Sequence, residues 1–442
     1  MKIAFVENRY RTLFWDAVAG HLAHHGHEIL FIVQNHSFRP TNGRAIVLPY
    51  PHKTELANPG EADLELIRSD RNINYFGHRS TGHYAYYRRL ISDCLKKEQP
   101  QIVFGESTAF HELITIDCCK NLSIPYLQPS TCRFPVGRFS FYRYDTLEPF
   151  SGSGEELKNE DAATLIDKIV HRTIKPDYMK RRKQTLSTRW ARLKDLSQLT
   201  FSYLTGEHYN TPAPWVKTRI ERQRRTQIRK WDDMAATRSK LLEKTGRFML
   251  LYPMQMQPEA NLDVWGRPFR NQLDTIQRII QHVPEDVYVI VKPNPKSKYE
   301  LTPELLNYIA NEERIIPILH ATPMGAVLPL ADLVITATGT VAIECILSDT
   351  PILTLIKTLN NDMKNCPWLN SFEELAKWVE QIRNNTFPKT TLSEKIAFVN
   401  RLNRTSFRGI PYETALREDN VSDCLKGFDY ILNEISQNTR NI

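Results

Sequence analysis

The sequence predicts an α/β protein with two Rossmann-like domains, because short apolar segments alternate with helical patterns in both halves of the chain. Residues 2–7 and 29–33 are strand-like, and the segment between them repeats apolar residues every four positions. Residues 287–291 form a fully apolar run, as expected for a parallel strand covered on both faces. Such alternation is typical of parallel sheets built from β-α-β units.

These patterns divide the chain into four predicted segments. Residues 1–150 form an N-terminal Rossmann-like domain, and residues 246–390 form a second one. Residues 151–245 are predicted to be a basic helical insertion or linker, and residues 391–442 a helical tail that packs back on the first domain. The aromatic stretch 133–156 is expected to be a loop.

Composition narrows the class of protein. Of the 442 residues, 41% are hydrophobic, yet no apolar run is long enough to span a bilayer. Glu7, Asn8 and Arg9 interrupt the apolar N-terminus, which argues against a signal peptide, so a cytoplasmic location is expected. The seven cysteines include no Cys-x-x-Cys pair, which favours free thiols over disulfides or a zinc cage. No GxGxxG motif occurs, so no cofactor is indicated.

Positive charge is concentrated in residues 171–230. This segment holds 16 Lys and Arg against four acids, a net +12, whereas the whole chain nets +8, so the remainder nets −4. Five aromatic residues are interleaved with the basic ones: Trp190, Phe201, Tyr203, Trp215 and Trp231. The combination suits an anionic membrane surface, so the segment is a candidate for peripheral contact with the inner face of the inner membrane. A solvated helical face is the alternative, and no nucleic-acid partner is expected.

Polar residues gather where predicted strands end, which is where open α/β sheets bind ligands. The strand at 248–252 is followed by amides and carboxylates: Gln255, Gln257, Glu259, Asn261 and Asp263. Side chains of this kind orient sugar hydroxyls and stabilise an oxocarbenium-like transition state. Glu259 is therefore the first catalytic candidate, with Asp263 near it; a hydrated loop that caps the next helix is the alternative.

Two further strand ends carry candidate ligands for a nucleotide. Lys292 and Asn294 follow the strand at 287–291, and Lys292 is placed to pair with a phosphate or carboxylate. Thr338, Gly339 and Thr340 precede a helix that holds Glu344. Gly339 lets a phosphate approach the backbone at the helix N-terminus, and Glu344 is placed to hold a ribose diol. The alternatives are a solvated lysine in an ordinary turn and a capped helix with an exposed glutamate.

In the first domain, Glu106 stands at a strand end as a candidate general acid or base, with His111 as its neighbour. A surface glutamate is the equally weighted alternative. His21 and His25 share a helix face, but no acid accompanies them in the HExxH manner and no DxD motif occurs. No metal site is therefore predicted.

Three motifs occur in order in the second half: YPMQMQPEANLDVWGRPFRNQ, VIVKPNPK and TATGTVAIE. Together, over residues 248–355, they resemble the capsule polysaccharide biosynthesis proteins, which include the bacterial β-Kdo transferases of capsule and O-antigen (lipopolysaccharide) assembly. The resemblance implies a GT-B-type fold, a nucleotide-activated donor such as CMP-Kdo, and a glycan acceptor. It points to Gln257, Glu259, Lys292, Gly339, Thr340 and Glu344, and less directly to Glu106. Relatives carry His where this chain has Asn294, whose neutral amide cannot act as a base or as a cationic phosphate ligand.

The sequence therefore predicts a metal-independent glycosyltransferase with a nucleotide-sugar donor and a glycan or glycolipid acceptor. The first domain is expected on the acceptor side and the second on the donor side. Three alternatives remain open: a UDP-sugar 2-epimerase-like enzyme or a glycerol-phosphate transferase on the same fold, and a non-catalytic scaffold of capsule export.

Overall fold

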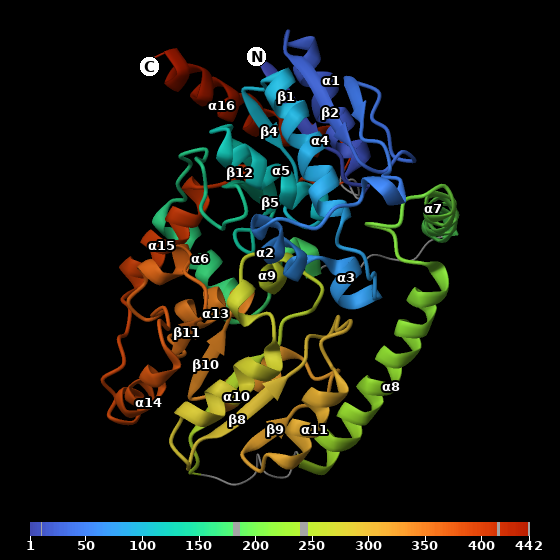
Figure 1. Ribbon diagram of the computed structural model, residues 1–442. Coiled ribbons are helices and arrows are strands. Elements are labelled where there is room, and N and C mark those ends of the chain that lie inside the picture. The colour runs from blue at the N-terminus through green and yellow to red at the C-terminus, as the bar shows by residue number, and fades with distance from the viewer. Residues whose placement is uncertain (10, 180–185, 239–245, 413–415, 441–442) are drawn as a thin grey trace. The chain divides into compact units, whose positions relative to one another are not determined.

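The computed structural model describes residues 1–9, 11–179, 186–238, 246–412 and 416–440. The chain divides into two compact units (Figure 1). Unit 1 contains Met1–Glu156, Pro176–Val216 and Asn400–Ile442, and unit 2 contains Leu157–Lys175 and Lys217–Val399. Residues 151–245, expected to form one insertion, are thus divided between the units. Lys180, Arg181, Arg182 and Lys183 of the predicted basic segment lie outside the described residues.

Unit 1 is built on a seven-stranded sheet in which β3, β2, β1, β4 and β5 are parallel. Two antiparallel strands, β6 and β12, extend the sheet beyond β5. The strands are β1 (Lys2–Val6), β2 (Glu28–Val33), β3 (Arg44–Val47), β4 (Ile102–Phe104), β5 (Tyr126–Thr131), β6 (Arg138–Arg143) and β12 (Phe407–Arg408). The last of these shows that the C-terminal part of the chain completes the first sheet.

Unit 2 is built on a five-stranded, fully parallel sheet with the order β9-β8-β7-β10-β11. Its strands are β7 (Met249–Pro253), β8 (Tyr288–Lys292), β9 (Ile315–Pro317), β10 (Leu333–Thr336) and β11 (Ile352–Thr354). Both units therefore repeat the strand order 3-2-1-4-5 of a Rossmann-like sheet. The predicted α/β class with two Rossmann-like domains is confirmed.

Helices cover both sheets. Unit 1 carries α1 (Thr12–His24), α2 (Glu61–Ser69), α3 (Arg71–Phe76), α4 (His83–Glu98), α5 (Phe110–Asn121), α7 (Leu186–Leu204) and α16 (Glu418–Arg440). Unit 2 carries α6 (Asn159–Val170), α9 (Ala260–Asp263), α10 (Gln272–His282), α11 (Pro303–Asn311), α12 (Met324–Val327), α13 (Thr340–Ser348) and α14 (Leu375–Arg383). Most of α8 (Pro214–Arg238) and α15 (Leu392–Arg404) also belongs to unit 2. None of the helices in the described ranges is long and apolar enough to cross a membrane.

An aromatic cluster joins the C-terminal helix α16 to the first sheet. The ring of Phe428 lies 4.9 Å from Phe141 of β6 and 5.0 Å from Phe104 of β4, centroid to centroid. It also meets Phe14 and Trp15 of α1, each at 6.4 Å. Because all five rings are buried, this contact anchors the end of the chain to unit 1.

The expectation of a loop over 133–156 is wrong for its central part, which forms β6. Phe139 and Phe141 alternate with Ser140 and Tyr142, and both phenylalanine side chains are fully buried. Ser140 between them is also buried, so this part of the strand is covered on both faces. The surrounding glycine and polar residues obscured it in the sequence.

Trp231 does not lie on the predicted basic surface. It is fully buried in the unit 2 core, and its indole Nε1 donates to the Ile318 carbonyl oxygen at 2.8 Å. The exposed Arg229 and Lys230 precede it on α8, whereas Trp231 and Ala235 are buried in the core. Arg224 and Arg238 of the same helix donate to the carbonyl oxygens of Ser297 and Ile309.

The histidines of α1 and the cysteines have structural roles. His21 lies 3.0 Å from the Asp429 carboxylate of α16. All seven cysteines are free, and six of them are buried. Within the described ranges, no group of three or more His, Cys, Asp or Glu side chains is placed to hold a metal ion.

We expect Phe428→Ala to lower the free energy of unfolding by about 3–5 kcal/mol, because the cavity would open among four large rings. Asn433→Ala, an exposed position on the same helix, should change it by less than about 0.5 kcal/mol. Urea unfolding monitored by circular dichroism measures both. Equal stability of the two variants would show that α16 does not anchor unit 1.

Candidate functional site

In unit 2, the three predicted strand-end elements follow adjacent strands, because β10, β7 and β8 are neighbours in the sheet. The strand order reverses between β7 and β10, and ligands bind at such reversals in open α/β sheets. Gln255 bridges this point: its Nε2 donates to Thr336 Oγ1 at 3.3 Å and to the Thr338 carbonyl oxygen at 3.4 Å. The loop after β7 and the turn after β10 are thereby tied together.

The turn after β10 has the geometry of an anion cradle. Gly339 has φ +112°, a conformation that strongly favours glycine, and a Cβ placed there would meet no atom within 4 Å. Directly after it, α13 begins at Thr340, so the positive dipole end of this helix faces the turn. The expected phosphate turn therefore has both backbone access and a favourable field.

Glu344 is not the exposed glutamate of the alternative interpretation. It lies one turn into α13, is mostly buried, and forms an ion pair with the Arg172 guanidinium. Burial raises the pKa of Glu344, and the charge of Arg172 opposes that rise. Arg172 follows α6, which packs against α13. The pair places a cation beside the helix that begins at the Gly339 turn.

The loop after β7 is held by a buried amide and carboxylate network. Gln257 Nε2 donates to Asp263 Oδ1 at 3.0 Å and to the Arg270 carbonyl oxygen at 2.9 Å, while its Oε1 accepts from Gln272 Nε2 at 2.9 Å. Asp263 Oδ2 accepts from the Glu259 backbone N–H at 2.8 Å. Gln257 and Asp263 are thus engaged in shaping the loop. Glu259 is half-buried, and its Oε2 accepts from Asn261 Nδ2 at 3.1 Å.

Lys292, the last residue of β8, is buried against two backbone carbonyl groups. Its Nζ donates to the Pro293 oxygen at 2.6 Å and to the His320 oxygen at 3.1 Å, which joins the ends of β8 and β9. Burial lowers the pKa of Lys292 to about 8, and Asp232 opposes this shift. The Asn294 side chain accepts from the Lys296 backbone N–H at 2.9 Å and so stabilises its own turn.

In unit 1, Glu106 stands at the corresponding reversal of strand order, between β1 and β4. Its carboxylate pairs with Arg11 and accepts from Asn8 Nδ2 at 3.4 Å. Burial raises the pKa of Glu106 above its ordinary range; Arg11 acts against the rise and Glu112 adds to it. A carboxyl group with a raised pKa at a strand end is suited to proton transfer.

Glu112 fixes the strand end that presents Glu106. It accepts hydrogen bonds from the backbone N–H groups of Glu106 at 3.1 Å, Thr108 at 3.0 Å and Ala109 at 2.7 Å. Gly105 is needed there because a Cβ would lie 2.1 Å from the Tyr126 hydroxyl. The sequence analysis singled out Glu106 but not the capping carboxylate six residues later.

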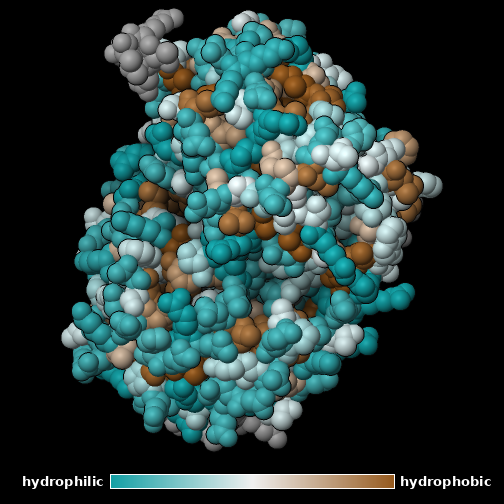
Figure 2. Space-filling view, viewed as in Figure 1, coloured by the Kyte–Doolittle hydropathy of each residue, from teal (hydrophilic) through white to brown (hydrophobic). Residues whose placement is uncertain are grey.

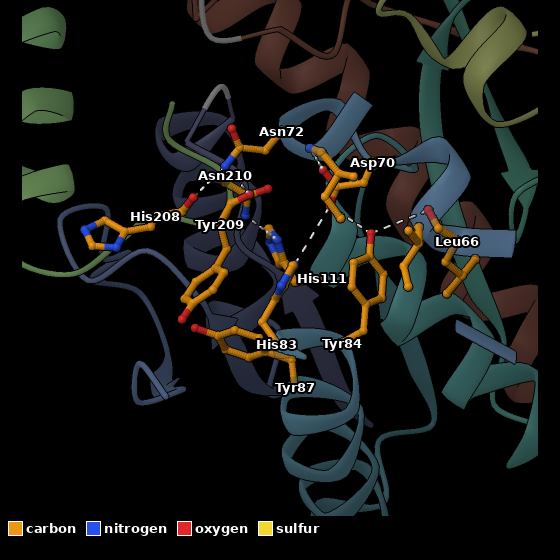
Figure 3. Close-up of polar contacts among 12 residues, drawn as sticks. Leu66, Asp70, Asn72, His83, Tyr84, Tyr87, His111, His208, Tyr209 and Asn210 are labelled. Carbon is orange, nitrogen blue, oxygen red and sulfur yellow. Dashed lines mark hydrogen bonds and ion pairs between the residues drawn. The ribbon is translucent and has the colours of Figure 1, made fainter. Parts of the chain in front are cut away.

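His111 belongs to a buried polar chain rather than to Glu106. Its Nε2 lies 2.9 Å from the Glu7 carbonyl oxygen and its Nδ1 lies 3.0 Å from Asn210 Nδ2 (Figure 3). These partners assign the proton to Nε2, with Nδ1 as acceptor. Asn210 continues the chain to Gln34 Oε1 at 2.9 Å, and Gln34 Nε2 donates to Glu207 at 3.2 Å.

His83, at the start of α4, is fully buried among aromatic rings (Figure 3). Its ring centroid lies 4.6 Å from that of Tyr209 and 4.9 Å from that of Phe110. The nearest carboxylate is that of Asp70, with Oδ2 at 4.0 Å from His83 Nε2, and Asp70 accepts from the Tyr84 hydroxyl at 2.8 Å. Burial lowers the pKa of His83 to about 3.

Two residues beside the unit 2 strand ends were missed by the sequence analysis. His320 lies three residues after the end of β9, so the strand-end rule could have found it. Within the described ranges its buried Nε2 has no hydrogen-bond partner. Arg172 carried no local signal, because it lies far from Glu344 in the sequence. It was visible only as one cation of the basic segment.

No family model matches the chain, and no curated protein matches its sequence. Solved structures that share similarity include the β-Kdo 2,7 transferase KpsC of Thermosulfurimonas dismutans, with 10% identity, TM-score 0.36, and coverage of 83% of this chain and 95% of that one. The UDP-GlcNAc 2-epimerase of Methanocaldococcus jannaschii has 14% identity, TM-score 0.29, and coverage of 92% and 97%. A glycosyltransferase of Rickettsia africae has 14% identity, TM-score 0.29, and coverage of 99% of both chains.

These matches are to glycosyltransferases and sugar epimerases, at low identity. Their TM-scores are below 0.5, so they add nothing to what the strand order of this chain shows by itself.

We expect His83 to make folding stability depend on pH. Its pKa falls from an ordinary 6.5 to about 3 on folding, so between these values the unfolded chain binds a proton that the folded chain does not. The free energy of unfolding is therefore unaffected by His83 well above pH 6.5 and declines as pH falls, by about 2 kcal/mol at pH 5.

Urea unfolding at pH 7 and pH 5 measures this effect. Between pH 7 and pH 5, His83→Phe should lose about 2 kcal/mol less stability than the unsubstituted protein, whereas His24→Gln, at an exposed position on α1, should retain the full pH dependence. Burial also lowers the pKa of His78 and His111, so both variants keep the part of the pH dependence that these two residues contribute. The buried carboxyl groups of Asp70 and Glu106 have raised pKa values, so their contribution to stability falls as pH rises, opposite to that of His83. The effect of His83 is therefore obtained by comparing variants. Equal pH dependence in His83→Phe and in the unsubstituted protein would contradict the assignment.

Proposed function

We propose that the chain is a glycosyltransferase that moves a sugar from a nucleotide-activated donor to a growing surface polysaccharide or lipid-linked glycan. The observation that carries the proposal is that Gln255 bridges to the Gly339 turn at the reversal of strand order in unit 2, with Lys292 at the end of the neighbouring strand. The order of the three motifs and their resemblance to capsule polysaccharide biosynthesis proteins support it.

In this proposal unit 2 binds the donor. The phosphate lies on the N–H groups at the start of α13, where Gly339 leaves space for it. Two N–H groups of Lys292 donate to carbonyl oxygens, so its remaining N–H and its charge act on the donor. Arg172 adds a second cation and orients Glu344, which is proposed to hold the ribose.

Gln257, Asn294 and Asp263 contribute through the loops that they hold, and Glu259 is the carboxylate of this edge proposed to act on the transferred sugar. CMP-Kdo is the donor implied by the resemblance, while Asn294 lacks the charge that histidine would supply. The transfer is further proposed to be independent of added metal, which activity in EDTA tests.

Gly339→Ala should abolish stabilisation by the nucleotide. The added Cβ would project into the proposed phosphate space, and the positive φ would cost about 1–2 kcal/mol. Gly246→Ala is the matched control: it also has a positive φ, +90°, and open space, but precedes β7 at the amino end of the sheet.

Thermal unfolding with CMP, UDP, GDP and CDP measures the effect. One nucleotide should raise the midpoint for the unsubstituted protein and for Gly246→Ala, but not for Gly339→Ala. No stabilisation by any of the four would count against a nucleotide-sugar transferase. Equal stabilisation of both glycine variants would show that the nucleotide phosphate does not bind at the Gly339 turn.

Glu106→Gln should lower kcat by about 10²-fold or more, because it removes a carboxyl group capable of proton transfer. Glu259→Gln should also lower kcat, and Glu313→Gln, at an exposed position of unit 2, should not. The substrate is the nucleotide sugar that contains the nucleotide found to stabilise the protein. The rate is measured as release of that nucleotide.

The pH profile separates a role in catalysis from a role in structure. The raised pKa of Glu106 predicts a titration above the ordinary glutamate range that disappears in Glu106→Gln. An unchanged profile would exclude Glu106 as acid or base. Recovery of the nucleotide sugar with one inverted stereocentre would instead favour the epimerase alternative.

A further inference from the structure

Helix α7 of unit 1 packs polar side chains against the unit and exposes large apolar side chains. The side that packs on the unit carries Gln198, whose Nε2 donates to the Ser37 carbonyl oxygen at 2.6 Å, and Ser202, whose hydroxyl donates to Ser37 Oγ at 2.7 Å. Ser202 is fully buried, and Leu199 beside it is 7% exposed. A surface helix ordinarily turns its apolar stripe to the protein and its polar residues to water.

Large apolar side chains of α7 point to solvent instead. Trp190 is 72% exposed, Leu193 57%, Phe201 62% and Leu204 75%. These four positions fall on one side of the helix at 100° per residue, with Leu196, 49% exposed, at its edge. Hydrophobic surface lies over α7 at the right-hand edge of the molecule (Figure 2). We call these five residues the α7 apolar face.

The start of α8 continues this face. Trp215 is 65% exposed, and its ring lies 5.5 Å from that of Tyr203 at the end of α7. Arg219 and Arg222 are exposed and follow Trp215 at spacings of four and seven, so they share its side of α8. Apolar and cationic side chains therefore adjoin.

Contiguous exposed apolar surface marks an interaction site, and the charges indicate what it contacts. The sequence of α7 contains Arg189, Arg192 and Lys194 against the single acid Asp195, within a segment that nets +12. A symmetric contact between two copies would bring together two segments of this net charge, which like charges oppose. Tryptophan, phenylalanine and leucine beside Lys and Arg suit the boundary of an anionic bilayer, where the rings enter the acyl layer and the cations meet headgroups.

We propose that the α7 apolar face and Trp215 attach this protein peripherally to anionic lipid membranes. This attachment rests on surface residues distant in sequence from Glu106, Gly339 and Lys292. It can therefore be tested separately from sugar transfer.

Co-sedimentation of the full chain with vesicles tests the proposal. The protein should sediment with phosphatidylcholine vesicles that contain about one third phosphatidylglycerol, should remain in solution with pure phosphatidylcholine, and should be released by high salt. Leu193→Ser combined with Leu204→Ser should weaken sedimentation about tenfold or more.

The matched control is Leu392→Ser combined with Leu330→Ser, exposed leucines of unit 2 at 58% and 42%, which should sediment like the unsubstituted protein. Thermal unfolding confirms that both double variants are folded. Light scattering measures the oligomeric state. Equal sedimentation of the two double variants, or equal binding to both vesicle types, would overturn the proposal. The proposal would also be overturned if the protein sedimented with neither type of vesicle and instead formed a dimer that dissociates in the α7 double variant.

Discussion

Both units depend on one constraint, the reversal of strand order beside the first strand of a parallel sheet. Right-handed crossovers place the helices that follow the two central strands on opposite faces, so the loops after those strands separate. In unit 1 the separated ends carry Asn8 and Glu106, and in unit 2 they carry Gln255 and the Gly339 turn. Polar groups thus gather at the point of each sheet where open α/β proteins bind ligands.

The two edges differ in electrostatic character, although their topology is the same. At the unit 2 edge, cationic or positively polarised groups predominate: Lys292, Arg172 and the N-terminus of α13. At the unit 1 edge, Glu106 and Glu112 share one surrounding with Arg11 as the opposing charge, and burial favours the protonated form of Glu106. Both strand ends are followed by a helix, so the proposed division of tasks, phosphate binding in unit 2 and proton transfer in unit 1, follows from the side chains at each edge rather than from the helix.

The sequence predicted the parallel sheets well, because a strand buried on both faces is a run of apolar residues. Residues 29–33 were expected as a strand and lie in β2, which begins one residue earlier. Short elements that depend on partners far away in the sequence were predicted poorly. An example is β12, in which Phe407 pairs with Phe139 of β6. Of the candidate site, Gly339 and Glu106 were predicted from their position at strand ends, and their roles stay predictions. Arg172 was not, because no periodicity relates it to Glu344, and the packing of α6 on α13 is what brings the two together.

The orientation of α7 follows from its polar contacts rather than from its apolar residues. Rotating the helix to bury Trp190 and Phe201 would expose Gln198 and Ser202 to water, and would leave Ser37 and Asn35 without the hydrogen bonds they share with these residues. Loss of buried polar partners costs about 1–3 kcal/mol per group, comparable with the gain from burying each large side chain. Within the protein, the polar contacts of α7 therefore oppose the gain that rotation of the helix would bring. An apolar environment outside the protein would add a term that favours only the orientation observed.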